Sequence, residues 1–200
     1  MLIVFAVALA AAFAGLPGCS GCRGKAPLAF VEHDAMVVVL IPSIADTVRH
    51  SKGLMAKLQQ GMLSAAMLAK PKADIKRELG FDPEKPETMK AKGIDPGRGI
   101  SVAVSSADEM SIVLGVADQG ALDKYLREQL GKVTRGAAKY KERTVSGVKM
   151  TLVMVGGGER AMGAWTFAKK HLVIGISKSS DPSVHVAKLV NLKKSIKDLA

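Results

Sequence analysis

Two cysteines, Cys19 and Cys22, are the most reactive side chains of this chain, and their C-x-x-C spacing suits thiol–disulfide exchange or metal binding. A redox motif of this kind normally belongs to a βαβ unit, whereas here it follows an apolar run without a strand. A tetrahedral zinc site would need two more ligands, and the chain has no other cysteine. The context therefore favours modification of a thiol over redox or metal chemistry.

An uncharged apolar segment precedes the cysteines. Residues 1–22 carry no charged side chain, and residues 2–14 are almost wholly apolar. This is typical of the hydrophobic region of a signal peptide and is short for a membrane span, which needs about 20 apolar residues. The order Leu16-Pro17-Gly18-Cys19 resembles the bacterial lipoprotein box, in which a lipid is attached to the cysteine and the chain is cut before it. By this resemblance residues 1–18 are a leader and Cys19 is the lipidation site.

Other fates of the leader stay open. It could be a plain signal peptide cleaved after Ala14, or an uncleaved anchor retained in the membrane. An ordinary buried helix fits less well, because such a helix normally carries polar residues on one face. We expect export to the bacterial cell envelope, with residues 19–34 as a tether and residues 35–200 as a folded domain that faces away from the cytoplasm.

The chain is strongly basic, with 29 Lys and Arg against 18 Asp and Glu and a net charge of +11. Such a charge attracts nucleic acid, an anionic membrane or an acidic polymer. The lysines are spread along the chain, and aromatic residues that could stack on bases make up only 4%. We therefore expect no nucleic-acid partner, and a basic surface near anionic lipid headgroups or an envelope polymer.

Motifs for phosphate binding have weak support. Gly156-Gly157-Gly158 lies between two predicted strands rather than between a strand and a helix, so it predicts a hairpin turn. Gly24-Lys25 lacks the upstream glycine and the following Ser or Thr of a P-loop. The sequence has no G-x-S-x-G nucleophile motif either.

Candidate metal ligands are equally sparse. Asp82 and Asp95 lack the dense oxygen pattern of a calcium loop, and Glu32-His33-Asp34 is only a local polar cluster. No two histidines have the spacing of a helical metal site; they are His33, His50, His171 and His185. We predict no catalytic residue, no cofactor and no metal ligand, although a triad that the fold assembles would be invisible in the sequence.

The elements that must position these residues follow from hydrophobic periodicity and turn residues. Strands are predicted at residues 36–41 (buried), 100–104, 110–116, 138–143, 148–155, 161–168 and 171–176. Helices are predicted at residues 44–50, 54–69, 73–79, 86–92 and 119–130, and from Asp181-Pro182-Ser183 to Ala200. The fold class is α+β, with antiparallel β-hairpins packed by amphipathic helices in the rough order β-α-α-β-β-α-β-β-β-β-α.

Two loops share the form Gly-apolar-Asp-Pro, at residues 80–83 and 93–96. In each, the glycine is expected to end a helix in the left-handed conformation and the apolar residue to fold back onto that helix. The Asp-Pro pair is expected to start a turn or the next helix.

Three features together resemble an uncharacterised family of exported bacterial lipoproteins. They are the apolar strand before Pro42, the twin loops leading to Gly97-Arg98-Gly99, and the pattern Thr144-Val145-Ser146-Gly147-Val148 before two hairpins. The resemblance covers most of residues 35–200. It implies an envelope location and a longer native chain, but it carries over no activity. A last helix that docks on the sheet is the alternative to a truncated C-terminus.

Three functions remain in view. The favoured one is a non-enzymatic, membrane-tethered envelope lipoprotein that binds or scaffolds a partner of unknown identity. The second is an exported enzyme acting on the cell wall or a secreted polymer, which would need acids or histidines converging in one cleft. The third is an extracytoplasmic small-ligand-binding domain, which would need a large apolar pocket lined by the methionines.

Overall fold

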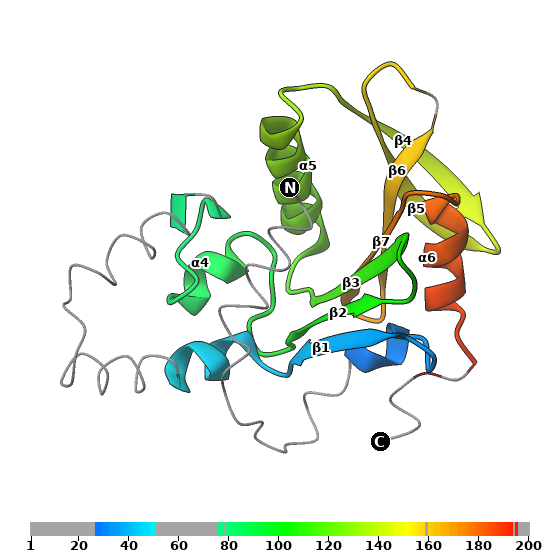
Figure 1. The fold of residues 1–200 in the computed structure, drawn as a ribbon. Helices are drawn as coiled ribbons and strands as arrows, with labels where there is room; N and C mark the ends of the chain where they lie inside the picture. The colour runs from blue at the N-terminus through cyan, green and yellow to red at the C-terminus, as the bar shows by residue number, and fades with distance from the viewer. Residues whose placement is uncertain (1–26, 51–75, 78, 159, 194, 196–200) are drawn as a thin grey trace.

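One seven-stranded antiparallel sheet, in the order β1-β2-β3-β7-β6-β5-β4, forms the centre of the fold (Figure 1). The computed structural model describes residues 27–50, 76–77, 79–158, 160–193 and 195. The strands are β1 (Val37–Ile41), β2 (Ile100–Val104), β3 (Glu109–Gly115), β4 (Ala138–Val145), β5 (Val148–Val155), β6 (Ala161–Ala168) and β7 (His171–Ser177). Residues 27–30 form a short 3₁₀ helix and residues 44–50 an α-helix, and the later helices are α4 (Pro86–Lys90), α5 (Gln119–Val133) and α6 (Pro182–Val190). The predicted α+β class and element order are confirmed.

The sheet consists of two antiparallel ribbons joined side by side. β1, β2 and β3 form the first ribbon, and β4 to β7 form the second. Helix α5 carries the chain from β3, in the middle of the sheet, to β4 at its far edge. The second ribbon then returns strand by strand until β7 pairs with β3.

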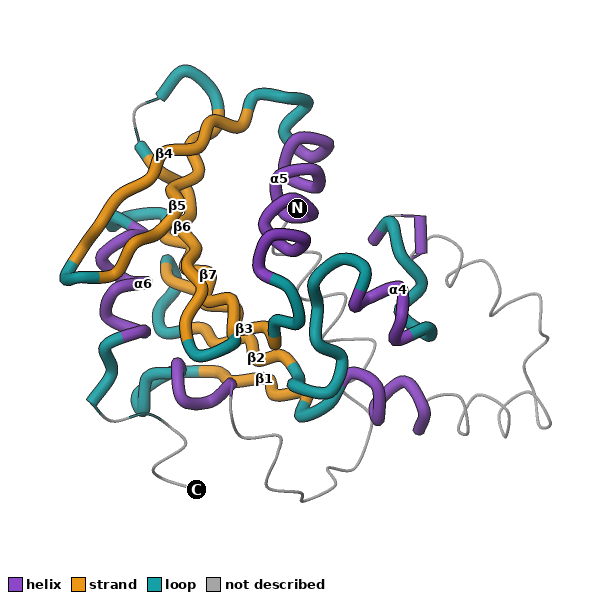
Figure 2. Tube along the Cα trace, turned by 180° about the vertical axis from the view of Figure 1, so that it is seen from behind, coloured by secondary structure: helices purple, strands orange, loops and turns teal. Residues whose placement is uncertain are grey.

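Helices cover both sides of the sheet, and Figures 1 and 2 show α5 and α4 on the opposite side from α6. On the α5 side, the large core joins Leu122 and Tyr125 of α5 to strand residues such as Ile112, Leu172 and Trp165. On the α6 side, α6 packs on β4 to β7, and the docked segment (residues 27–32) packs on the other ribbon.

No helix among the described residues is long and apolar enough to cross a membrane.

Helix caps follow the predicted signals. The Asp118 side chain accepts a hydrogen bond from the Ala121 amide at the start of α5, and Asp181 accepts one from the Ser183 amide at the start of α6. At its other end α5 runs past the predicted stop at Gly131, because the left-handed residues that end it are Arg135 and Gly136.

The twin loops adopt the predicted conformation. Gly80 and Gly93 have φ of +66° and +79°, and the apolar residues after them, Phe81 and Ile94, are buried in the core. Each aspartate accepts a hydrogen bond from the backbone amide two residues on, at 3.0 Å in both loops. A Cβ on Gly93 would lie 2.2 Å from the Asp118 carbonyl oxygen and 2.5 Å from the Leu122 amide, so glycine is required where this loop touches α5.

Three predictions about the elements need correction or extension. The 36–41 segment is an edge strand rather than a buried one, with Met36 71% and Val37 54% exposed, because an apolar run does not specify the position of a strand in its sheet. Helix α6 ends at Val190, and Asn191 caps it. The predicted 54–69 helix and the last five residues lie outside the described residues.

The folded body also includes the docked segment, which we predicted to be part of the tether. Phe30 is 2% exposed and Val31 is fully buried, and the Pro27 carbonyl accepts a hydrogen bond from the Ser101 hydroxyl at 3.4 Å. The short apolar patch in this segment is thus core rather than linker, because the sheet offers it an otherwise open apolar surface.

Replacing Gly93 by alanine should lower the free energy of unfolding by about 3 kcal/mol, from left-handed strain and from the clash with α5. Urea unfolding measures the effect. The matched control is Gly131→Ala, whose Cβ would meet nothing within 4 Å and which should stabilise α5 by up to about 1 kcal/mol. Equal stabilities of the two variants would contradict this account of the loop.

Candidate functional site

The predicted site residues fall into two groups. Cys19, Cys22 and the Gly24-Lys25 pair lie outside the described residues, so the lipidation of Cys19 stays a prediction. Asp82 and Asp95 are described, and each carboxylate lies beside a basic side chain. Lys76 Nζ is 3.4 Å from Asp82, and Arg98 Nε is 2.9 Å from Asp95. Both aspartates therefore act in their own loops, as acceptors for backbone amides and partners of cations.

Two of the histidines are exposed, and the other two are buried. His33 and His50 are exposed, and His50 Nδ1 lies 2.8 Å from the Asp46 carbonyl oxygen. His171 and His185 are only 3% and 4% exposed, and the Nε2 atom of each is buried without a hydrogen-bond partner. Across the part of the chain that the structure describes, no three His, Cys, Asp or Glu side chains are grouped as a metal site.

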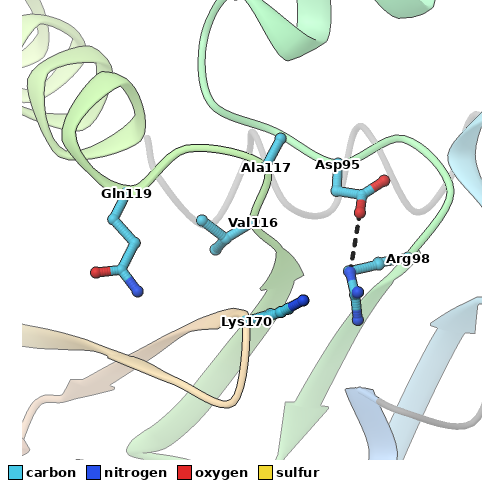
Figure 3. A pocket seen from close by; sticks show the side chains of 6 residues that line it. All are labelled: Asp95, Arg98, Val116, Ala117, Gln119 and Lys170. Atoms are coloured by element: carbon cyan, nitrogen blue, oxygen red, sulfur yellow. Dashed lines mark hydrogen bonds and ion pairs between the residues drawn. The ribbon is translucent and has the colours of Figure 1, made fainter.

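A first surface depression, of about 270 Å³, lies where the second Gly-apolar-Asp-Pro loop meets α5 and the β6–β7 turn (Figure 3). An ion pair with Asp95 holds Arg98 at the rim of the depression, and Lys170 extends into the same region from the β6–β7 turn. The remaining lining residues are Val116, Ala117 and Gln119. Because Asp95 already neutralises Arg98, the depression offers an anion little more than Lys170.

A second depression, of about 280 Å³, lies beside Trp165. The Trp165 indole donates to Asp123 Oδ1 at 3.0 Å, and Arg127 Nε donates to Asp123 Oδ2 at 2.6 Å. The Arg127 guanidinium also stacks over the Tyr140 ring at 4.5 Å. The polar atoms of this network interact with one another. The network therefore holds α5 against the second ribbon and leaves few polar groups that could bind a ligand.

A partly buried polar cluster lies between α6 and the sheet. Glu109, at the start of β3, accepts a hydrogen bond from the Ser180 hydroxyl at 2.8 Å, and its other carboxylate oxygen is 3.9 Å from His185 Nδ1. The Ser177 and Ser180 hydroxyls are 2.7 Å apart. The carboxylate stands between the serine and the histidine, so this is not a nucleophilic triad, in which the histidine must reach the serine.

The docked segment closes the same cluster from the other side. Glu32 is 5% exposed, and its carboxylate lies 2.7 Å from Lys188 Nζ on α6. The hydrogen bond with Glu32 raises the pKa of Lys188, so the lysine stays charged. A charge pair thus connects the segment nearest to Cys19 with the last described helix.

No local pattern in the sequence predicts this Glu–His cluster. His185 precedes Val186 on the helix, and its burial could have been predicted from the apolar stripe. Its acidic neighbours could not, because Glu32 and Glu109 come from the docked segment and β3, which only the tertiary fold brings to α6.

Burial lowers the pKa values of His171 and His185, and for His185 the nearby Glu109 and Glu32 offset this only in part. An unfolded histidine titrates near 6.5, so the unfolded chain binds more protons just below that pH. We therefore expect the free energy of unfolding to be largest above about pH 6.5 and to fall as the pH decreases toward about 5. Urea titrations over this range measure the slope.

Substitutions of the two buried histidines show which residue causes this pH dependence. His185→Gln and His171→Gln should each reduce the slope of the free energy of unfolding with pH. Burial acts to raise the pKa of Asp181, but hydrogen bonds from Ser183 and Arg143 outweigh this and hold its pKa low, so its contribution is lost only below about pH 4. A wild-type stability that is flat or rises between about pH 6.5 and 5 would contradict the assignment.

Comparison of the chain with models of protein families, with curated proteins and with solved structures finds no match.

Proposed function

We propose that this chain is a non-enzymatic lipoprotein of the bacterial cell envelope, in which lipid on Cys19 holds a binding or scaffolding domain at a membrane surface. The docked segment is the observation that supports this most. This segment packs onto the sheet through the buried Phe30 and Val31, and the Glu32–Lys188 pair connects it to α6. A lipid on Cys19 would thus be joined to the domain by a short connection.

The length of that connection limits the reach of the domain. Pro27 follows Cys19 by eight residues, which span at most about 28 Å when fully extended. The domain would therefore stay beside the membrane instead of exploring the space beyond it. A single acyl chain binds membranes reversibly, and a lipoprotein with several chains would remain anchored.

The alternatives find less support among the described residues. An enzyme needs reacting groups that converge in a cleft, whereas the acids lining the two depressions are held by cations or an indole. A small-ligand domain would have an apolar pocket lined by methionines, and Met150 is the one methionine lining either depression. Tethering and binding through a surface is therefore the function we favour.

Lipid labelling of the expressed full chain tests this proposal. The wild type should incorporate labelled lipid and sediment with membranes, and Cys19→Ser should lose both, because no other thiol occupies the lipoprotein box. Metabolic labelling with a fatty-acid analogue and membrane fractionation measure the two properties.

Cys22→Ser is the matched control and should keep both the label and the membrane association. An unlabelled but membrane-bound Cys19→Ser protein would show an uncleaved anchor. A wild type that is neither labelled nor membrane-bound would overturn the proposal.

A further inference from the structure

The docked segment and α6 lie on one side of the sheet. Phe30 packs with Val113 of β3, Val173 of β7 and Leu189 of α6. Val31 packs with Ala103 of β2 on the same side. Since the chain enters the domain through this segment, its entry point belongs to the α6 side. A lipid anchor at the proposed Cys19 would therefore pull on this side of the domain.

The same side carries two lysines from the edge strand β4. Lys141 pairs with Leu152 and Arg143 with Met150, both of which pack against α6, and directly opposed side chains share a face. Strand alternation places Lys139 on this face as well. Lys139 and Lys141 are exposed, and no described acidic side chain forms an ion pair with either.

Several acids on this side are already neutralised within the domain. Asp181 lies 2.6 Å from Arg143, and Glu32 lies 2.7 Å from Lys188. Pairing at these positions leaves the charge of Lys139 and Lys141 uncompensated. A surface of this kind is attracted to anionic headgroups over a distance of about 10 Å at moderate salt.

An exposed apolar side chain accompanies the basic ones. Val184, on the outer face of α6, is 57% exposed. Apolar groups beside lysines are typical of surfaces that rest at the headgroup boundary.

We infer that the α6 side faces the membrane and contacts anionic phospholipid headgroups through Lys139 and Lys141, with Val184 at the lipid boundary. This rests on the proposed anchor at Cys19. Basic residues occur on the α5 side too, such as Lys124 and Lys132, so the deciding features are the entry point of the chain and the exposed Val184.

Site-directed fluorescence quenching tests this orientation. The lipidated full chain, carrying Cys22→Ser, is reconstituted in phosphatidylcholine vesicles with phosphatidylglycerol and nitroxide-labelled lipid. A fluorophore is placed at Val184→Cys, and the control probe is Lys90→Cys on α4, which lies far from α6 in both Figures 1 and 2. We expect quenching at Val184 to exceed that at Lys90 several-fold.

Charge variants show whether the lysines, and not only the position of the tether, bring the α6 side to the membrane. Lys139→Glu with Lys141→Glu should lose most of the excess quenching, as should vesicles of phosphatidylcholine alone. The matched pair Lys124→Glu with Lys132→Glu on α5 should keep it.

The outcomes distinguish the proposed orientation of the α6 side from the proposed anchor at Cys19. Equal quenching at the two probe positions in an anchored protein would overturn the orientation and leave the anchor standing. Excess quenching that survives both the β4 charge reversal and the neutral vesicles would overturn the role of the lysines. A chain that incorporates no lipid and does not associate with vesicles would overturn the anchor and the orientation together.

Discussion

The pairing of β3 with β7 is the constraint on which the structure depends. These strands come from ribbons that α5 and three further strands separate along the chain, and they join over seven residue pairs. Val113 and Val173 face each other in this pairing and are both fully buried. Because the two ribbons become one sheet here, the pairing creates both helix-covered sides and places Glu109 within reach of α6.

The two sides of the sheet are built differently. The α5 side is a large apolar core, closed by the Tyr125 hydroxyl donating to the Leu79 carbonyl at 2.8 Å. The α6 side combines small apolar contacts with buried serines, histidines and Glu32. Gly175 permits this arrangement, since a Cβ there would lie 2.7 Å from Val186 and 3.0 Å from the His185 ring. Close approach of α6 therefore brings its polar side chains into contact with the sheet.

Elements from the two ends of the described chain complete the α6 side. The docked segment covers the first ribbon, α6 covers the second, and the Glu32–Lys188 pair connects them. A buried carboxylate needs such a partner, because leaving it unpaired in a low-dielectric layer is costly. The chain enters the domain beside its last described helix, so the anchor proposed at Cys19 would lie on this side of the sheet.

Local patterns by themselves determined the strands, their hairpins and the twin Gly-apolar-Asp-Pro loops. Strand β2 and strand β5 have the predicted bounds, because alternation, β-branched residues and turn glycines act over a few neighbouring residues. Tertiary structure alone decided that β1 is an edge strand, that residues 27–32 are core and that His185 lies beside Glu109. These properties depend on the order of strands in the sheet and on which distant segments meet across it, and hydrophobic spacing within one segment contains no information about either.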